Sequence, residues 1–112
     1  MVKKYVPTRG DIAWLTFSPH AGHEQADRRP AVAISPREYN DKVGLALFCP
    51  ITSQIKGYPF EVALPRDCGA TGVILADQIK SLDFRARNSE FIFHLPDDII
   101  DELMAKVRVL LE

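Results

Sequence analysis

Short apolar runs separated by turn residues are the main pattern along this chain. In residues 60–64 apolar and polar positions alternate, as they do in a strand with one buried face. Proline, glycine, asparagine or aspartate lies between most runs, and these residues favour turns. Several short strands at this spacing are typical of a small antiparallel β-barrel or sandwich. The pattern predicts strands at residues 11–17, 30–35, 44–49, 60–64, 72–76, 79–84 and 91–93.

The period changes at the end of the chain. From Asp97 to Leu111 the apolar residues recur at helical spacing, and acidic residues gather at the start, where the helix dipole favours negative charge. The spacing predicts a C-terminal helix packed on the barrel by one apolar face. Residues 36–40 are predicted to form one helical turn capped by Ser35. The predicted fold is mainly β with a C-terminal α-helix, in a single domain spanning residues 1–112.

Composition narrows the class of protein without indicating an activity. The chain of 112 residues is 46% hydrophobic and 26% charged, with a net charge of −1, which is ordinary for a globular domain. This balance does not by itself indicate a nucleic-acid binder. Cys49 and Cys68 form no metal-type pair, and we expect both to be buried thiols of a reduced, cytoplasmic protein. The sequence predicts neither a signal peptide nor a membrane span.

Polar residues that can act on a phosphodiester gather at three predicted strand ends, in residues 24–30, 50–54 and 77–78. Arg29 precedes Pro30, and proline restricts the residue before it to extended conformations. Arginine stays protonated and suits bidentate contact with phosphate. If the strands pair, their ends converge. Each residue can equally form a turn or a surface ion pair, so the grouping alone leaves the function open.

A family resemblance indicates a function for these polar residues. The chain resembles the MazF/PemK toxins, ribonucleases of bacterial toxin–antitoxin pairs, over nearly its whole length. No single motif decides the resemblance, which rests on the order and spacing of all of them. The matching stretches are Tyr5–Pro7 with Gly10 and Asp11, Gly22–Gln25, Arg29–Val32, Ser35 and Pro36 with Tyr39 and Asn40, Pro50–Ser53, Lys56–Val62 and Leu75–Gln78.

The resemblance implies a fold, a reaction and partners. The family fold is a small β-barrel with a C-terminal helix, and it acts as a homodimer. Its members cleave single-stranded RNA, typically messenger RNA, at short motifs without a metal or other cofactor. The 2′-hydroxyl of the RNA attacks, which leaves a 2′,3′-cyclic phosphate and a 5′-hydroxyl. A cognate MazE-like antitoxin binds across the dimer and blocks the RNA site.

Three residues match the catalytic positions of the family. Arg29 is expected to stabilise the charge on the pentacoordinate phosphate. Thr52 is expected to hold a phosphate oxygen through its hydroxyl, although a strand-end hydroxyl can instead bond its own turn. Glu24 is a candidate base for the 2′-hydroxyl, but it can also form an ion pair with Arg28 or Arg29.

Further residues are possible catalytic or RNA-binding groups. His23 can polarise the phosphate or move a proton, and it can also be an exposed loop residue. Asp77 is the base in some PemK-like members, but those have arginine two residues earlier, where this chain has Leu75. We therefore expect Asp77 to be structural or to contact RNA. The remaining candidates are Gln25 and Gln78 for base edges, Lys56 for a phosphate in a mobile loop spanning 53–59, and Arg28 and Ser53. Residues 40–44 are expected to form a second mobile loop beside the site.

Two rival functions remain. CcdB-like gyrase poisons share the fold class but use a tryptophan in a C-terminal tail, whereas the one tryptophan here is Trp14. We expect Trp14 in the core rather than as a surface on which RNA bases stack. A homologue that binds RNA or antitoxin without cutting is the second rival. Glu24, Arg29 and Thr52 argue against it. His20 and His23 alone make a poor metal site, so no metal is expected.

Overall fold

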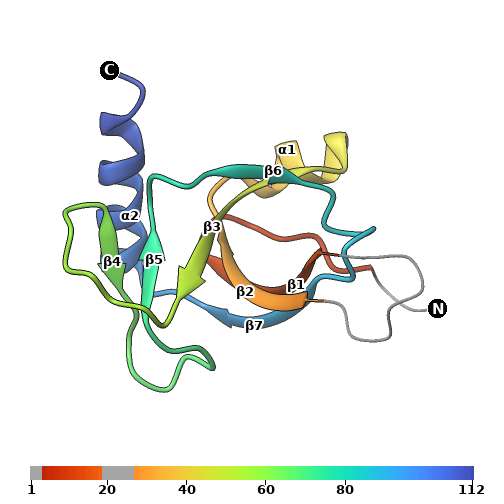
Figure 1. Ribbon diagram of the computed structural model, residues 1–112. Helices are drawn as coiled ribbons and strands as arrows, with labels where there is room; N and C mark the ends of the chain where they lie inside the picture. Colours follow the sequence, from red (N-terminus) through yellow and green to blue (C-terminus); the bar gives the residue numbers. More distant parts are fainter. Residues whose placement is uncertain (1–3, 19–26) are drawn as a thin grey trace.

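The computed structural model describes residues 4–18 and 27–112. Seven strands and two helices lie in this part of the chain, which confirms the predicted mainly β class with a C-terminal helix (Figure 1). In order they are β1 (Asp11–Ser18), β2 (Asp27–Ala33), α1 (Arg37–Val43), β3 (Ala46–Thr52), β4 (Glu61–Ala63), β5 (Val73–Leu75), β6 (Lys80–Leu82), β7 (Glu90–His94) and α2 (Asp97–Val109).

The strands form one antiparallel sheet in the order β4-β5-β3-β2-β1-β7, with β6 also paired to β3. The first half of β3 pairs with β6, through Ala46 and Leu82, and its last residue Thr52 pairs with Val73 of β5. Among the described residues β4 and β7 do not pair, so the curled sheet stays open and is a barrel only in a loose sense. In Figure 1, α2 stands beside β4 and β5, while α1 lies near β6.

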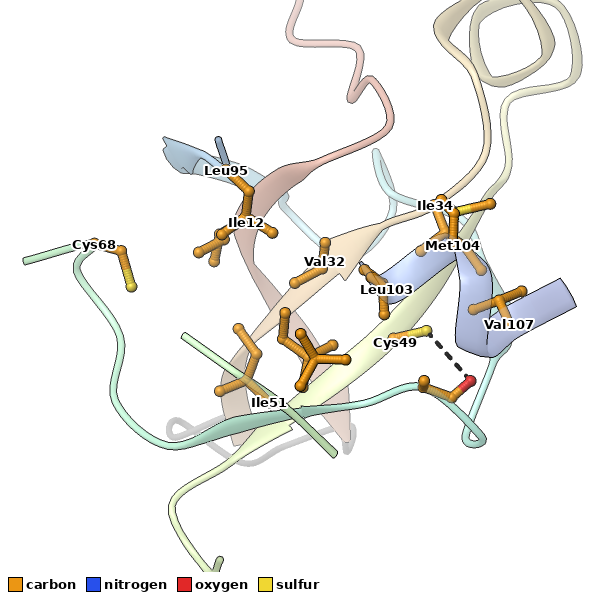
Figure 2. Close-up of a cluster of buried hydrophobic side chains, with 13 residues drawn as sticks. Ile12, Val32, Ile34, Cys49, Ile51, Cys68, Leu95, Leu103, Met104 and Val107 are labelled. Carbon is orange, nitrogen blue, oxygen red and sulfur yellow. Dashed lines mark hydrogen bonds between the residues drawn. The ribbon is translucent and has the colours of Figure 1, made fainter. Parts of the chain in front are cut away.

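The core lies on both faces of the curled sheet. Side chains alternate along a strand, so β2 sends Val32 into one hydrophobic cluster and Ala31 and Ala33 into another. Figure 2 shows the first cluster, where Leu103 and Val107 of α2 pack over the sheet. The predicted apolar face of the C-terminal helix is thereby confirmed for its middle turns, whereas the helix ends at Val109 and leaves Leu110 and Leu111 exposed.

The local prediction around α1 was wrong in two respects. Residues 40–44, predicted as a loop, contain the end of a helix that begins at Arg37 and is capped at its C-terminus by Gly44, with φ of 80°. Ser35 does not cap this helix. Its hydroxyl donates to Asn40 Oδ1 at 2.5 Å and accepts the Leu47 N–H at 2.9 Å. Asn40 is fully buried. The conformation of this segment is therefore set by burial of the Asn40 amide group and not by chain flexibility.

β3 continues beyond the point where the sequence predicted its end. The prediction stopped this strand before Pro50, because proline lacks the N–H that a ladder needs. Pro50 instead lies between the β6 ladder at residues 46–48 and the β5 ladder at residues 51–52, where neither neighbour requires that N–H. β2 likewise begins at Asp27 and not at Pro30. Because of these extensions, the candidate residues Arg29 and Thr52 lie within regular strands.

Two further predictions concern burial and membranes. Cys49 and Cys68 are free and buried, as expected. Burial raises the pKa of the Cys49 thiol to about 12, with a smaller contribution from the charge of Asp77. Within residues 4–18 and 27–112, neither helix has the length and apolarity needed to cross a membrane.

Candidate active site

Three adjoining cavities run across the ends of β2, β3 and β5. The central cavity, of about 340 Å³, is lined by Arg29, Thr52 and Gln78 among others. A cavity of about 500 Å³, here called the Trp14 cavity, shares Arg29 and Ile51 with it. A third of about 300 Å³, here called the Lys56 cavity, shares Thr52 and Gln78 with the central one. Their shared walls make the three cavities one groove.

The register of β2 and β3 explains how Arg29 and Thr52 meet. The two strands are antiparallel, with Ala31 opposite Pro50. This pair is the last of the ladder, and Arg29 and Thr52 lie two residues beyond it on their own strands. Both side chains line the central cavity. The structure therefore brings together a guanidinium and a hydroxyl that the sequence separates by more than twenty positions.

The guanidinium of Arg29 is held by a carboxylate on its own strand. Nε donates to Asp27 Oδ1 at 3.0 Å, and Nη2 lies 3.0 Å from Oδ2. Residues two apart on a strand share a face, so both side chains reach the same cavity. This contact uses the Nε–Nη2 edge of the guanidinium and leaves the Nη1–Nη2 edge for a second anion.

Thr52 makes the turn contact that the sequence allowed for its hydroxyl. Its Oγ1 accepts the N–H of Gln54 at 3.1 Å, which fixes the turn after β3. A hydroxyl can accept and donate at once, so the Thr52 hydrogen can still be donated into the cavity.

The loop after β3 is fixed by two acidic side chains. The Glu61 carboxylate accepts the N–H groups of Lys56 at 2.9 Å and Gly57 at 2.8 Å. The Tyr58 hydroxyl donates to Asp77 Oδ1 at 2.7 Å, and this hydrogen bond is the main cause that raises the Tyr58 pKa to about 12. Asp77 thus ties the loop to the residues after β5, while Lys56 and Tyr58 line the Lys56 cavity.

The other predicted residues fall in different places. Arg28 points to the opposite face of β2, where its guanidinium bonds Thr16 Oγ1 and the Asn88 carbonyl, each at 2.9 Å. It also pairs with Glu90 at 3.2 Å. Ser53 lines the Trp14 cavity. The predictions for His23, Glu24 and Gln25 lie outside the described residues.

Sequence reasoning missed three residues of the groove. Trp14, expected in the core, is only half-buried and lines the Trp14 cavity. Asp27 and Lys80 line the central cavity. The signal for Asp27 was its spacing of two residues from Arg29, visible only once β2 is known to begin at residue 27.

Comparison with known proteins now decides the family. Residues 8–111 match the sequence profile of the PemK-like, MazF-like toxins of type II toxin–antitoxin systems. The chain belongs to this family. It is 46% identical to the endoribonuclease toxin MazF of Escherichia coli K12, over 99% of both chains. Against the crystal structure of MazF from Deinococcus radiodurans it gives a TM-score of 0.85 with 50% identity, covering 96% of this chain and 98% of the other.

A second solved structure contains the relative together with a partner protein. The MazE–MazF complex of D. radiodurans matches this MazF-like chain with a TM-score of 0.87 and 50% identity, over 96% of this chain and 97% of that one. The predicted MazF/PemK resemblance and the predicted class, an endoribonuclease toxin, are both confirmed. These relatives do not favour the gyrase-poison or non-cleaving alternatives.

Proposed function

We propose that this MazF-like toxin cleaves single-stranded RNA, with messenger RNA as its target, in the cavity that Arg29 and Thr52 line. The observation that carries the proposal is that Arg29 of β2 and Thr52 of β3 line one cavity, which brings a guanidinium and a hydroxyl together. Lys80 lines the same cavity and adds a second cation for a polyanion.

The reaction follows from the groups that meet there. The RNA 2′-hydroxyl attacks the adjacent phosphorus, the O2′–P bond forms and the P–O5′ bond breaks. The proton of the 2′-hydroxyl passes to a base, for which we propose Glu24, and a proton returns to the departing 5′ oxygen. Arg29 and Thr52 stabilise the extra negative charge on the phosphorane oxygens, which is where a preorganised donor accelerates the reaction most. The nucleophile belongs to the RNA, so we propose that no metal or cofactor takes part.

The flanking cavities suit the neighbouring nucleotides. The half-buried ring of Trp14 offers a surface on which an unpaired base can stack. On the other side Lys56 can contact a phosphate, and Gln78 can read a base edge. Gln25, Ser53 and His23 are proposed as further contacts of the same strand of RNA, and Asp77 as the carboxylate that holds Tyr58 beside it.

We also propose the partners and compartment. The D. radiodurans relative was crystallised with MazE, and we propose that a MazE-like antitoxin covers the groove of this toxin. We propose further that the toxin is a homodimer of the cytoplasm.

Cleavage of a single-stranded RNA in the presence of a metal chelator tests the proposal. The expected products end in a 2′,3′-cyclic phosphate and begin with a 5′-hydroxyl. Arg29→Ala is expected to fold and to cleave about 10²–10³-fold more slowly, as for loss of one preorganised donor. Arg85→Ala is the matched control, because Arg85 is also an exposed arginine in an ion pair, with Asp41, but lies outside the groove.

Three results would contradict the proposal. Intact RNA with stalled gyrase would indicate a gyrase poison. Intact RNA that stays bound would indicate a non-cleaving homologue. If Arg29→Ala cleaved RNA at the parent rate, the assigned mechanism would be excluded.

A further inference from the structure

We infer that Asp27 is a positioning residue for the reaction: it orients the guanidinium of Arg29 so that one edge is presented to the RNA phosphate. This inference rests on the proposed function, because it assigns a role within the same groove.

The geometry supporting it is a two-point contact. Both oxygens of Asp27 meet the guanidinium, Oδ1 at Nε and Oδ2 at Nη2, each at 3.0 Å. A single hydrogen bond would leave the planar group free to rotate about its long side chain, whereas the hydrogen bond at Nε together with the ion-pair contact at Nη2 restricts its plane. Arg29 is 63% exposed on its side chain, so little packing holds it otherwise.

The strand supplies the rigidity that makes the contact useful. Asp27 and Arg29 are two residues apart on β2, which pairs with β1 through Leu15 opposite Arg29 and, past an irregularity in β1, Ser18 opposite Asp27. Both backbones are therefore set by the sheet, and a short aspartate side chain has few rotamers to lose. Charged residues on a rigid strand hold a catalytic geometry better than residues on a loop.

The contact also decides which edge of Arg29 stays available. With Nε and Nη2 occupied, the Nη1–Nη2 edge remains for the phosphate, and Thr52 lines the same cavity. A carboxylate in this place has two other conceivable effects. It can compete with the phosphate for Arg29, or it can itself take the proton of the 2′-hydroxyl. The three roles give different kinetics.

Steady-state cleavage by Asp27→Asn and Asp27→Glu separates them. Asparagine keeps the size but loses the charge and the ion-pair contact at Nη2, so kcat is expected to fall by up to about 100-fold, with a smaller change in KM. Glutamate keeps the two-point contact and is expected to retain most of the parent kcat. Asp41→Asn, which removes a carboxylate from a surface ion pair on α1, is expected to match the parent.

The same substitution in an Arg29→Lys background tests whether Asp27 acts through Arg29. Lysine keeps the charge but has no planar fork, so Asp27→Asn is expected to cause no further loss of kcat there. An equal loss in both backgrounds would overturn the inference in favour of an independent base or a structural role. A lower KM with unchanged or higher kcat for Asp27→Asn would overturn it in favour of competition.

A measurement without RNA keeps the inference separate from the proposed function. Nitrogen NMR of the arginine side chains is expected to show slow rotation and slow Nε–H exchange for Arg29 in the parent, and fast rotation in Asp27→Asn. A freely rotating Arg29 in the parent would overturn the inference while leaving RNA cleavage intact. A parent that folds but cuts no RNA would instead overturn the proposed function.

Discussion

Gly72 lies directly against the backbone of Thr52: a Cβ atom on residue 72 would lie 1.9 Å from the Thr52 carbonyl oxygen. Gly72 also has φ of +112°, a conformation that side chains rarely adopt. The start of β5 can therefore approach the end of β3 only because residue 72 has no side chain. This contact fixes where Thr52 stands in the groove.

Gly72→Ala is expected to damage both stability and catalysis. The added methyl group must push the Thr52 backbone away, since the atoms it meets are main-chain atoms that cannot rotate aside. We expect a loss of about 1–3 kcal/mol in the free energy of unfolding from strained backbone, and a lower kcat at temperatures where the variant is folded. Denaturant unfolding and RNA cleavage measure the two effects.

Gly57→Ala is the matched control for this prediction. Gly57 also has positive φ, of +84°, but a Cβ there would meet nothing within 4 Å. It reports the cost of the backbone conformation alone. Equal destabilisation by both substitutions would show that the contact with Thr52 carries no weight.

Thr52→Val and Thr52→Ser form a pair that isolates the hydroxyl. Valine keeps the shape of the side chain but can neither donate to a phosphate nor accept the Gln54 N–H. Its rate of RNA cleavage is expected to fall about 10²-fold, as for the loss of one preorganised donor. Serine keeps the hydroxyl and is expected to stay near the parent rate. A valine variant as fast as the serine variant would exclude Thr52 from the reaction.

The sequence predicted the large features of this fold because they depend on local patterns. Alternation and turn residues located the strands, and helical spacing located α2. The errors came from contacts between distant segments. Pro50 reads as a strand end until two different strands are known to pair with β3 on either side of it. Asn40 reads as a turn residue until its amide is seen to donate to the Pro7 and Ser35 carbonyls.

In the site, too, the sequence identified individual residues but not the contacts that depend on strand pairing. The restraint of Pro30 and the family resemblance together pointed to Arg29, but the face of each side chain depends on where β2 begins. A start at residue 27 puts Arg29 in the groove beside Asp27 and sends Arg28 to the other face, against Thr16. Neither the contact of Asp27 nor that of Arg28 follows from the sequence without the register.

The hydrogen bond from Tyr58 to Asp77 predicts a titration in the alkaline range. The bond raises the Tyr58 pKa from 10.0 to about 12. A raised pKa means that the contribution of the protonated phenol to stability is complete below pH 10.0 and is lost as the pH rises toward 12. The loop between β3 and β4 is expected to loosen over this interval.

Phenolate absorbance measures this directly. Asp77→Asn is expected to lower the Tyr58 pKa toward its ordinary value, because the uncharged amide no longer opposes ionisation of the phenol. Subtracting the curve of Tyr58→Phe assigns the signal among the three tyrosines of the chain. An unchanged Tyr58 titration in Asp77→Asn would contradict the assigned hydrogen bond.

The buried carboxylate of Asp11 joins the first residues described to the end of β7. It is 5% exposed and accepts three hydrogen bonds, from the Tyr5 hydroxyl at 2.7 Å, the Thr8 N–H at 3.1 Å and His94 Nδ1 at 2.8 Å. Burial, and then the hydrogen bond to Asp11, raise the pKa of Tyr5. The three donors come from two distant segments, so Asp11 holds those segments together.

Asp11→Ala is therefore expected to destabilise the fold by about 1–3 kcal/mol, the cost of leaving partly buried donors without an acceptor. Tyr5→Phe removes one donor along with its need for a partner, so it is expected to cost less. Asp41→Ala, at an exposed ion pair on α1, is expected to stay within about 0.5 kcal/mol of the parent. Denaturant unfolding of the three variants measures how much free energy of unfolding each substitution removes. If Asp11→Ala unfolds at the same denaturant concentration as Asp41→Ala, the network contributes nothing to stability.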